Sequence, residues 1–489
     1  MGGLSRFKAA LYNRPSMTRY QELADDIEAS IKAGILQPDE KLPSVRHTSA
    51  RRGISASTVF QAYYLLEARG LVRARERSGY FVVRQPRSSP PQPTAASTPE
   101  DRRFAVVDVS ERVFEVLESA MDRELVPLGS AFPSPQLFPL QRLGQCLAKA
   151  ARHIDPRSTF DDLTPGSAAL RRQIARRYLA DGLALSPADL LITNGALEAL
   201  NLSLAAVTRP GGAVLIESPC FYGALQALER MGLSAIEVPT HPGEGMDLAA
   251  LEAAIVRHRP QALWLMTSFQ NPLGSLMPVA RKKALVELVT RHELPLIEDD
   301  VYGELYFGDQ RPPPAKAFDT QGWVLHCSSF SKCLAPGWRI GWVAAGRFAR
   351  AVARHKLTST LATNAPVQLA LADYLESGGL DKHLRRLRQA LLQQRDQMLA
   401  AIARYFPAGT QATRPEGGYF AWLQLPGNCN TQHLYRQALE HRISLAPGAV
   451  FSASPGFEHC LRLNFGHPFT PALDEALARL GQLATQAAA

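Results

Sequence analysis

The stretch HCSSFSKCLAPGWRIGW, residues 326–342, is the part of the sequence around which the other features are arranged. Lys332 lies at its centre among small and hydroxylated residues, after the apolar run 323–325 and before an apolar segment rich in glycine. This pattern predicts the point where a strand meets a loop. An amine held there among groups that lower its pKa can form an imine with an aldehyde cofactor, and pyridoxal phosphate (PLP) is the usual one. A lone lysine at a loop edge is commonly inert, so this interpretation depends on the rest of the chain.

The length and composition predict a globular protein of several domains. The 489 residues exceed what one core organises, and a hydrophobic content of 46% is sufficient for burial. No apolar run reaches the ~18–20 residues that span a bilayer, and the N-terminus lacks a signal-peptide core. We therefore expect a cytoplasmic location and no membrane partner. The six cysteines show no C-x-x-C pair, so neither a disulfide framework nor a metal site is predicted.

Positive charge is concentrated at the N-terminal end. Residues 1–84 hold 14 Lys and Arg against 8 Asp and Glu, a net of +6, while the other 405 residues hold 40 against 37, a net of +3. Clustered Arg is suited to neutralising phosphates, so nucleic acid is the expected partner of this end. Basic tails of ordinary enzymes give similar counts, so charge alone does not decide between a nucleic-acid-binding end and an ordinary basic tail.

A Pro, Ser and Thr-rich stretch, RQPRSSPPQPTAASTPEDRR, follows the basic end. It contains almost no large apolar residue, so it cannot bury enough surface to fold by itself. We predict a flexible linker at 85–104 that separates a domain at 1–84 from a body at 105–489.

The N-terminal domain has the pattern helix, helix, helix, hairpin. Residues 18–33 place Leu23, Ile27 and Ile31 at helical spacing; Ser44 precedes a second helix, and Ser55 or Ser57 caps a third that ends near Arg69. Residues 71–73 and 79–83 alternate like a short hairpin. This is a winged helix-turn-helix layout, in which the third helix enters the major groove. The residues assigned to its core are Tyr63, Tyr64, Leu65 and Leu66.

The strings GILQPDEKLPSVR, SASTVFQAYYLLEARGLV and SGYFV make residues 17–84 resemble the DNA-binding module of the GntR regulators. The resemblance implies a double-stranded DNA operator, contacted by the start of the third helix and by the wing. The implied DNA-binding residues are Arg46, Ser55, Ser57, Thr58, Arg75, Arg77 and Gly79. Arg can pair with guanine O6 and N7, while hydroxyls at a helix start suit phosphates. Each single Ser or Arg could instead be a cap or a solvated charge.

The body alternates apolar strand-like runs with helices of ten or more residues between about 190 and 329. This predicts an α/β fold with a mostly parallel sheet covered on both faces. Ligands of such sheets bind at the carboxyl ends of the strands. Polar residues fall at those ends: Asn194, Asn271, Asp299 and Ser329 each follow an apolar run.

These strand ends match the needs of PLP. Asp299 would pair with the pyridine nitrogen, and Asn271 and Tyr302 could hydrogen-bond to the ring hydroxyl. Arg339, Ser329 and the amides of a helix start would bind the phosphate, Phe221 could stack on the ring, and Lys332 would form the Schiff base. The candidate cofactor residues are Gly195, Ala196, Phe221, Asn271, Asp299, Tyr302, Ser329, Lys332 and Arg339. An ordinary capped turn at 194–196 and plain core packing of Phe221 remain the alternatives.

The strings TNGALEAL, NPLG, EDDVYGEL and SFSKCLAPGWRIGW resemble the fold-type I aminotransferases of class I, over about residues 110–480. The resemblance implies a PLP-dependent transferase-like homodimer, with a large domain at about 180–365 and a smaller α+β domain from 105–179 and 366–489. It also implies that Arg462, in RLNF, grips a substrate α-carboxylate. Two departures are Phe221, where family members often have tyrosine, and the lack of a match near 160–163 for the tyrosine that reaches the neighbouring subunit's phosphate.

The whole chain resembles the MocR-type transcriptional regulators, in which these two modules are joined. The implied function is a PLP-dependent DNA-binding regulator that senses PLP or an amino compound through Lys332. The alternative is an active aminotransferase of amino acids and 2-oxo acids with an appended DNA-binding domain. A PLP carrier without DNA binding is a third possibility.

Overall fold

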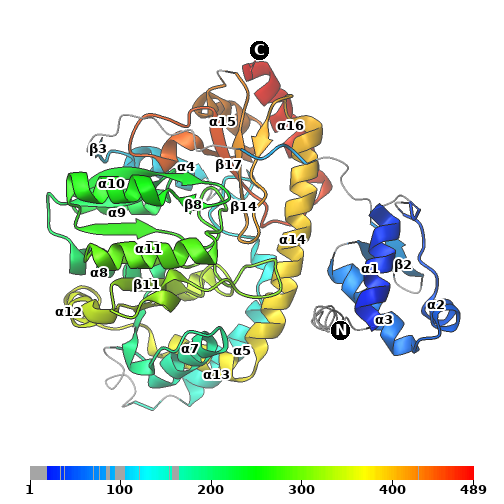
Figure 1. The fold of residues 1–489 in the computed structure, drawn as a ribbon, viewed down its shortest axis with the longest axis horizontal. Coiled ribbons are helices and arrows are strands. Elements are labelled where there is room, and N and C mark those ends of the chain that lie inside the picture. The colour runs from blue at the N-terminus through cyan, green and yellow to red at the C-terminus, as the bar shows by residue number, and fades with distance from the viewer. Residues whose placement is uncertain are drawn as a thin grey trace, which may run out of the picture. The chain divides into compact units, whose positions relative to one another are not determined.

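The computed structural model describes residues 19–32, 35–37, 39–69, 71–75, 78–83, 89–93, 105–119, 122–153, 155–156, 165–427 and 429–488. The chain divides into two compact units, Met1–Arg87 and Ser88–Ala489 (Figure 1). Arg77, residues 160–163 and most of the predicted linker lie outside the described residues. The predicted division of the body into a large and a small domain stays a prediction.

The N-terminal unit contains the predicted three helices and hairpin: α1 (Arg19–Lys32), α2 (Val45–Arg52), α3 (Ala56–Ala68), β1 (Val72–Arg75) and β2 (Gly79–Val82). The two strands pair antiparallel, with Val72 opposite Val82. Ser44 caps α2 by accepting a hydrogen bond from His47 N at 3.2 Å, and Ser55 caps α3 by accepting one from Thr58 N at 3.1 Å. Both predicted helix starts are confirmed, since each cap satisfies an amide that the helix leaves free.

The core of this unit is built on the inner face of α3. Val59, Tyr63 and Leu66 are at most 1% exposed, and the Tyr63 hydroxyl donates to Pro43 O at 2.8 Å. Tyr64 is 65% exposed, so its assignment to the core was wrong. One residue step turns a helix by about 100°, and Tyr63 already fills the inward position that its neighbour would need.

The sheet of the second unit has nine strands, in the order β3-β7-β6-β9-β10-β11-β12-β5, with β8 paired to β7. The five strands from β7 to β11 pair parallel, whereas β12 and β5 at one end and β3 at the other pair antiparallel. The strands are β3 (Ala105–Val106), β5 (Leu190–Thr193), β6 (Ala213–Ser218), β7 (Ser234–His241), β8 (Gly245–Met246), β9 (Ala262–Leu265), β10 (Leu296–Asp299), β11 (Val324–Ser329) and β12 (Gly341–Ala344). The predicted mostly parallel sheet is confirmed.

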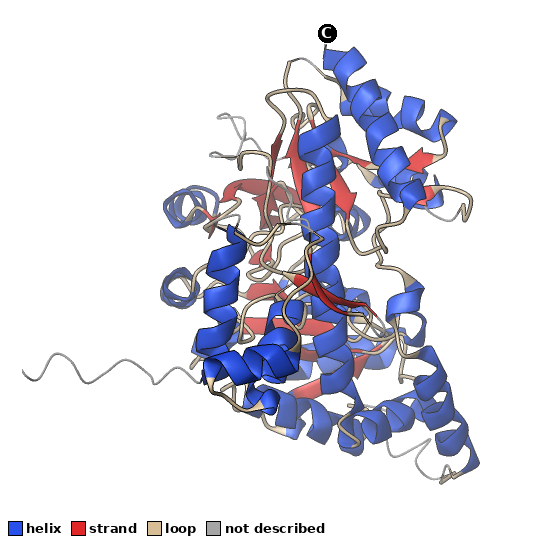
Figure 2. Ribbon diagram, turned by 90° about the vertical axis from the view of Figure 1, so that its right-hand side faces the viewer, coloured by secondary structure: helices blue, strands red, loops and turns tan. Residues whose placement is uncertain are grey.

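Helices cover both faces of this sheet (Figure 2). Ile216 and Leu325 face a core shared with Leu200 and Leu228, whereas their neighbours Leu215 and Val324 face a second core shared with two other helices. Alternate residues point to opposite faces, which explains why the strands read as continuous apolar runs. The covering helices are α8 (Ala196–Val207), α9 (Tyr222–Arg230) and α12 (Ala349–Ser359) on one face, and α10 (Leu248–His258) and α11 (Val279–Arg291) on the other.

A second sheet, in the order β13-β14-β17-β16, carries the C-terminal part of the body. Its strands are β13 (Gln411–Ala412), β14 (Phe420–Gln424), β16 (Ala446–Pro447) and β17 (Cys460–Asn464), while β4 (Val126–Pro127) and β15 (Ile443–Ser444) pair by themselves. The remaining helices are α4 (Ser110–Ser119), α5 (Leu140–Arg152), α7 (Ala168–Ala180), α13 (Ala365–Glu376), α14 (Gly379–Tyr405), α15 (Thr431–Glu440) and α16 (Pro471–Ala488). In Figure 1, α14 runs beside both the α5–α7–α13 group and the second sheet.

Residues 89–93 of the predicted linker contact the body. Pro91 O accepts a hydrogen bond from Ala412 N at 3.0 Å, and Pro93 is buried. Short 3-10 turns complete the fold at Pro135–Leu137, Pro187–Asp189, Ala315–Phe318, Pro336–Trp338, Gly346–Phe348 and Gly448–Phe451. Among the helices of the described residues, none has the length and apolar content needed to cross a membrane.

Candidate cofactor and DNA sites

Asp299 ends β10 as a buried carboxylate with an unused acceptor. Its side chain is 1% exposed, and Oδ1 has no hydrogen-bond partner among the described residues. Burial raises the pKa of Asp299 to about 7, and the neighbouring Asp300 charge acts in the same direction. A buried, charged carboxylate with an unpaired oxygen destabilises the fold unless a cationic or N–H partner binds it. The expected role of Asp299, to pair with a protonated ring nitrogen, stays a prediction, and its Oδ1 could accept such a partner.

Lys332 lies in the loop after β11, partly buried. Its Nζ donates to Ala131 O at 3.0 Å and lies 3.9 Å from the centre of the Phe132 ring. Burial lowers the pKa of Lys332 to about 7; the positive charges of Arg462 and Arg339 add to this, while Asp299 opposes it. Near neutral pH a large fraction of this amine is uncharged, which is the form that attacks an aldehyde.

A cradle for an anion lies between α8 and Arg339. Arg339 Nη2 donates to Asn194 O and Nη1 donates to Ser331 Oγ, both at 3.2 Å. Gly195 precedes α8 with φ 84° and ψ 171°, provides no side-chain cap, and has no room for a Cβ, which would collide with Arg339 Nη2. The first amides of α8 have no partner within the helix and lie next to a guanidinium, an arrangement that suits a phosphate. The Gly195 amide itself donates to Thr193 O at 2.9 Å. Ser329 Oγ accepts from Ser331 N at 3.3 Å at the same loop.

Arg462 on β17 is 1% exposed and is held by groups from three segments. Nη1 donates to Asn271 Oδ1 at 3.0 Å, and Nη2 donates to Gly129 O at 2.7 Å and to Ser130 O at 3.3 Å. Its guanidinium carbon lies 4.0 Å from the centre of the Phe420 ring, and Nε has no partner among the described residues. Asn271 Oδ1 is thus engaged with Arg462, and the expected hydrogen bond from Asn271 to the ring hydroxyl stays a prediction.

Residues 129–132 form a segment whose backbone carbonyl groups accept hydrogen bonds from several side chains of the site. Besides its bond from Lys332, Ala131 O accepts from the Tyr419 hydroxyl at 3.1 Å. Asn464 Nδ2 donates to Ser130 O at 2.9 Å and to Phe132 O at 2.8 Å. Sequence reasoning missed this segment, because backbone carbonyls carry no residue-type signal. It also missed Tyr419, and it missed Asn464 although this residue lies in RLNF, the string that contains Arg462.

Aromatic residues line the site. Tyr302 is 2% exposed and makes edge contacts with Tyr419 and Phe420, with ring centres 5.4 Å and 5.7 Å apart. Burial raises the pKa of Tyr302, so its hydroxyl stays protonated and able to donate. Phe221 is half-buried at the start of α9, 5.0 Å from Tyr222 between ring centres. A ring-stacking role for Phe221 stays a prediction.

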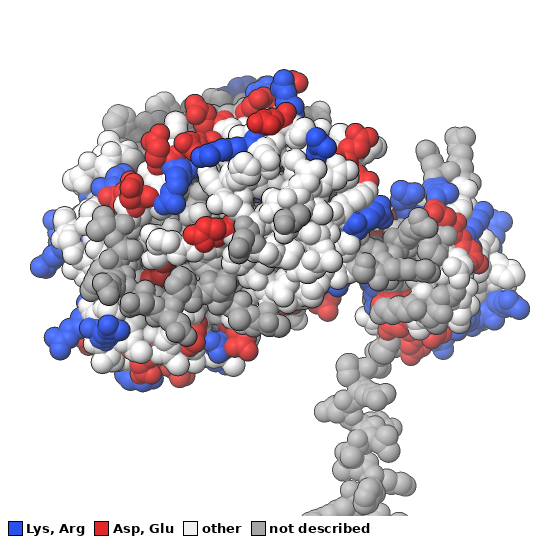
Figure 3. Space-filling view, turned by 90° about the horizontal axis from the view of Figure 1, so that it is seen from above, with Lys and Arg blue, Asp and Glu red and all other residues white. Residues whose placement is uncertain are grey.

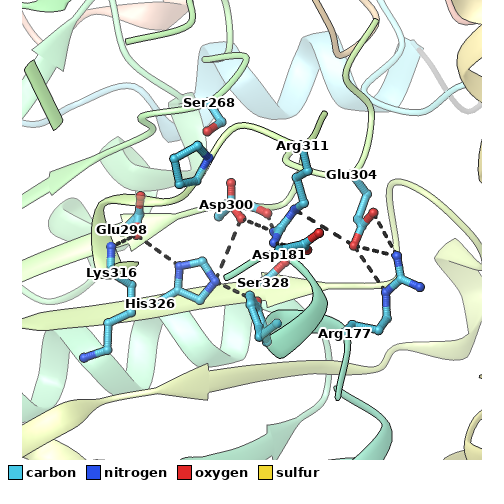
Figure 4. Close-up of polar contacts among 12 residues, drawn as sticks. Arg177, Asp181, Ser268, Glu298, Asp300, Glu304, Arg311, Lys316, His326 and Ser328 are labelled. Atoms are coloured by element: carbon cyan, nitrogen blue, oxygen red, sulfur yellow. Dashed lines mark hydrogen bonds and ion pairs between the residues drawn. The ribbon is translucent and has the colours of Figure 1, made fainter. Parts of the chain in front are cut away.

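A buried network of charges supports the end of β10 next to Asp299 (Figure 4). Asp300 accepts from Arg311 Nη2 at 2.7 Å, and His326 Nδ1 lies 3.1 Å from Glu298 Oε2. Although burial opposes it, the hydrogen bond from His326 and the nearby positive charges lower the pKa of Glu298 to about 2. These pairs fix the strand end through paired, hydrogen-bonded charges. Their partners are far apart in sequence, which is why sequence reasoning did not find them.

The candidate DNA-binding residues lie on the N-terminal unit, and Figure 3 shows Lys and Arg side chains on the surface of that unit. Arg46 is exposed on α2, and Ser55 is the cap of α3. The Ser55 Oγ also lies 2.8 Å from Ser57 Oγ and 2.7 Å from Thr58 Oγ1. Arg75 pairs with Asp39 at 2.7 Å. Gly79 begins β2 with φ 102°. The cofactor candidates thus converge in the body, and the DNA candidates stay on a separate unit.

Two family models match this chain: aminotransferase class I and II over residues 140–480, and bacterial regulatory proteins of the gntR family over 19–82. The uncharacterized HTH-type transcriptional regulator YdcR of Escherichia coli K12 is 47% identical over 467 residues, covering 96% of this chain and 99% of that protein. Aromatic-amino-acid aminotransferase 1 of Thermococcus litoralis is 31% identical, covering 76% and 91%. The crystal structure of LysN, the α-aminoadipate aminotransferase of Thermus thermophilus, complexed with N-(5′-phosphopyridoxyl)-L-leucine, matches with a TM-score of 0.71 and 32% identity, covering 78% and 96%.

Proposed function

Because this chain belongs to the aminotransferase class I and II family and joins that fold to a gntR-family DNA-binding domain, the MocR-type architecture, we propose that it is a transcriptional regulator whose DNA binding responds to ligands of a PLP site. The family takes PLP as its cofactor. The observation that carries the proposal is the convergence of Asp299, whose Oδ1 has no partner among the described residues, the partly neutral Lys332 and the first amides of α8 beside Arg339. The same chain also has a winged helix. Because the expected ligand is a DNA operator, we place the action of this protein in the cytoplasm.

The residues present fit this cofactor. Asp299 would hold the ring nitrogen, Gly195, Ala196, Ser329 and Arg339 would hold the phosphate, and Lys332 would attach the aldehyde. When bound, PLP supplies an electrophilic carbon and an electron-withdrawing ring. The protein's part is to present a neutral Lys332 amine and a carboxylate next to a protonated ring. Tyr302, whose pKa is raised by burial, keeps a proton that it can donate to a ring oxygen.

Ligand sensing would use the segment 129–132. Gly129 O and Ser130 O occupy Arg462, the side chain that an amino acid carboxylate would pair with. A charged, two-oxygen partner binds a guanidinium about twice as strongly as neutral carbonyls do, so the carboxylate would compete with this segment. Displacing it would also change the bonds that Lys332, Tyr419 and Asn464 donate, because these bonds end on Ala131 O and Ser130 O of the same short segment. Such a change in packing, in a twofold homodimer, would reposition two DNA-binding units on paired half-sites.

Attachment of the cofactor tests the site. After incubation with PLP and reduction with borohydride, we expect a stable adduct on the wild-type chain and on the Lys283→Ala variant, whose lysine is exposed, but none on Lys332→Ala. Mass spectrometry of the digested protein locates the modified residue. An adduct retained by Lys332→Ala would contradict the assignment.

A second candidate function is transamination. Two observations favour it. Arg462, the residue that the family resemblance assigns to a substrate carboxylate, is held in the site by its hydrogen bond to Asn271. Relatives named as an aminotransferase or a transaminase cover about three-quarters of this chain. Steady-state assays with amino acids and 2-oxo acids separate the two: turnover near ~10 s⁻¹ supports the enzyme. Slow half-reactions together with ligand-dependent operator binding support the regulator. A PLP carrier without DNA binding is contradicted if Arg46→Ala weakens duplex binding and lowers its salt dependence.

A further inference from the structure

The third helix of the N-terminal unit has two faces of different character. Its inner face packs in the core through Val59, Tyr63 and Leu66. Its outer face carries two exposed aromatic residues one turn apart, Phe60 at 54% and Tyr64 at 65% exposure. Residues at i and i+4 lie side by side on a helix, so the two rings form one apolar surface. Neither ring is needed by the core of the unit.

The outer face carries no charge. Its exposed residues are Ala56, Ser57, Phe60, Gln61 and Tyr64, so it presents a hydroxyl, an amide and two rings but no guanidinium. Such a face cannot pair with guanine through a bidentate Arg. The apolar group that a base presents in the major groove is the C5-methyl of thymine, and an aromatic side chain can pack against it. Gln61 beside it has the donor and acceptor that suit adenine, the partner of thymine.

Positive side chains lie on α2 and β1, two elements that contact α3. Residues 41–66 contain Lys41, Arg46, Arg51 and Arg52 but no Asp or Glu. Arg46, Arg51 and the wing residue Arg73 are exposed and form no ion pair with another described residue. The acidic residues Asp25 and Glu28 instead pair with Arg69, at the other end of α3. An apolar helix face, with exposed cations on the neighbouring elements, matches a groove whose floor carries methyl groups and whose walls are phosphates.

We propose that the outer face of α3 reads A·T base pairs, with Phe60 packing against a thymine methyl group. The proposal rests on the proposed function, since it requires that α3 enter the major groove of an operator. It specifies a property that the proposed function does not, namely the base composition of the positions in each half-site that α3 contacts. A docking site for a protein is the other use of an exposed aromatic face, and the test below separates it from base reading.

The test removes the methyl group from the DNA. An operator defined by footprinting with the full-length protein is resynthesised with single thymines replaced by deoxyuridine, which lacks the C5-methyl. For wild type, we expect at least one position per half-site where the replacement weakens binding about fourfold, the value for burying one methyl group. Phe60→Ala should bind the thymine operator about as weakly as wild type binds the uracil one, and should show no further loss on replacement. Phe60→Leu should restore part of the methyl dependence.

Controls keep the outcomes distinct. Ile35→Ala removes an apolar side chain of 73% exposure outside α3 and should leave the methyl dependence unchanged. Equal thermal unfolding of Phe60→Ala and wild type shows that the fold is intact. Specific binding that ignores the methyl group at every position, or an equal methyl effect in Phe60→Ala, overturns the inference and leaves the proposed function standing. A Phe60→Ala variant altered only in oligomeric state overturns it in favour of a protein contact. Absence of specific binding to any duplex overturns both.

Discussion

The substitution Gly195→Ala tests the anion cradle, because it adds one methyl group at the place where the structure has no room for it. The new Cβ would collide with the Arg339 guanidinium, which Asn194 O and Ser331 Oγ hold at 3.2 Å. The backbone at Gly195, with φ 84° and ψ 171°, lies in a region that is open essentially to glycine alone. We expect the helix start and Arg339 to shift apart.

The expected loss of PLP affinity follows from the hydrogen bond between Arg339 and the phosphate that this shift would break. A hydrogen bond to a charged group contributes about 1.5–3 kcal/mol, so moving Arg339 away from the phosphate should weaken PLP binding about 10- to 150-fold. The strained backbone adds a cost of about 1–3 kcal/mol to the stability of the protein without ligand. Titration of each apo-protein with PLP, followed by absorbance, gives the affinity, and thermal unfolding gives the stability.

Gly337→Ala is the matched control. Gly337 lies two residues before Arg339, and a Cβ there meets nothing within 4 Å. This variant should bind PLP like wild type. If Gly195→Ala keeps an affinity within twofold of wild type, then the cradle is not where the phosphate binds.

Three further results are expected. Burial raises the pKa of Asp299 to about 7, so its charge destabilises the apo-protein as the pH rises from about 4 to 7. Asp299→Asn should therefore raise the free energy of unfolding of the apo-protein at pH 8 by about 2–4 kcal/mol and weaken PLP binding. No gain in thermal unfolding temperature would contradict this. Because the pKa of Lys332 is lowered to about 7, the rate of PLP attachment measured by stopped flow should rise about tenfold from pH 6 to pH 8 and then level off; a midpoint near pH 10 would contradict it. Ser44→Ala removes the cap of α2 and should cost the N-terminal unit about 1 kcal/mol in denaturant unfolding, whereas an unchanged midpoint would mean that His47 N finds another acceptor.

The sequence allowed the order of elements and the polar strand ends to be predicted, because buried parallel strands read as apolar runs and ligands lie where those runs stop. Asp299, Lys332 and Arg339 could be found in this way. Helix caps at Ser44 and Ser55 were also readable, since the cap bond is local. The cap predictions succeeded because the cause lies within a few residues of the effect, whereas the roles of Asp299, Lys332 and Arg339 stay predictions.

The remaining features depend on contacts between distant segments. Arg462 meets Gly129 O across more than 300 residues of sequence, and Arg311 meets Asp181 across 130. Periodicity does not encode such pairs, and a backbone acceptor has no residue type to mark it. Tyr64 was misplaced for a different reason: the string FQAYYLLEA is apolar on more than one side, so the pattern alone does not say which aromatic residue faces inward.

The central claim is that occupancy of the cofactor site changes DNA binding, and operator affinity measured with and without PLP tests it most directly. The measurement uses the full-length protein at fixed salt, since phosphate contacts make affinity salt-dependent. We predict that PLP, and then an added amino acid, changes the affinity or footprint of wild type, and that Lys332→Ala binds DNA but does not respond. Identical operator binding by wild type in all three states would contradict the account.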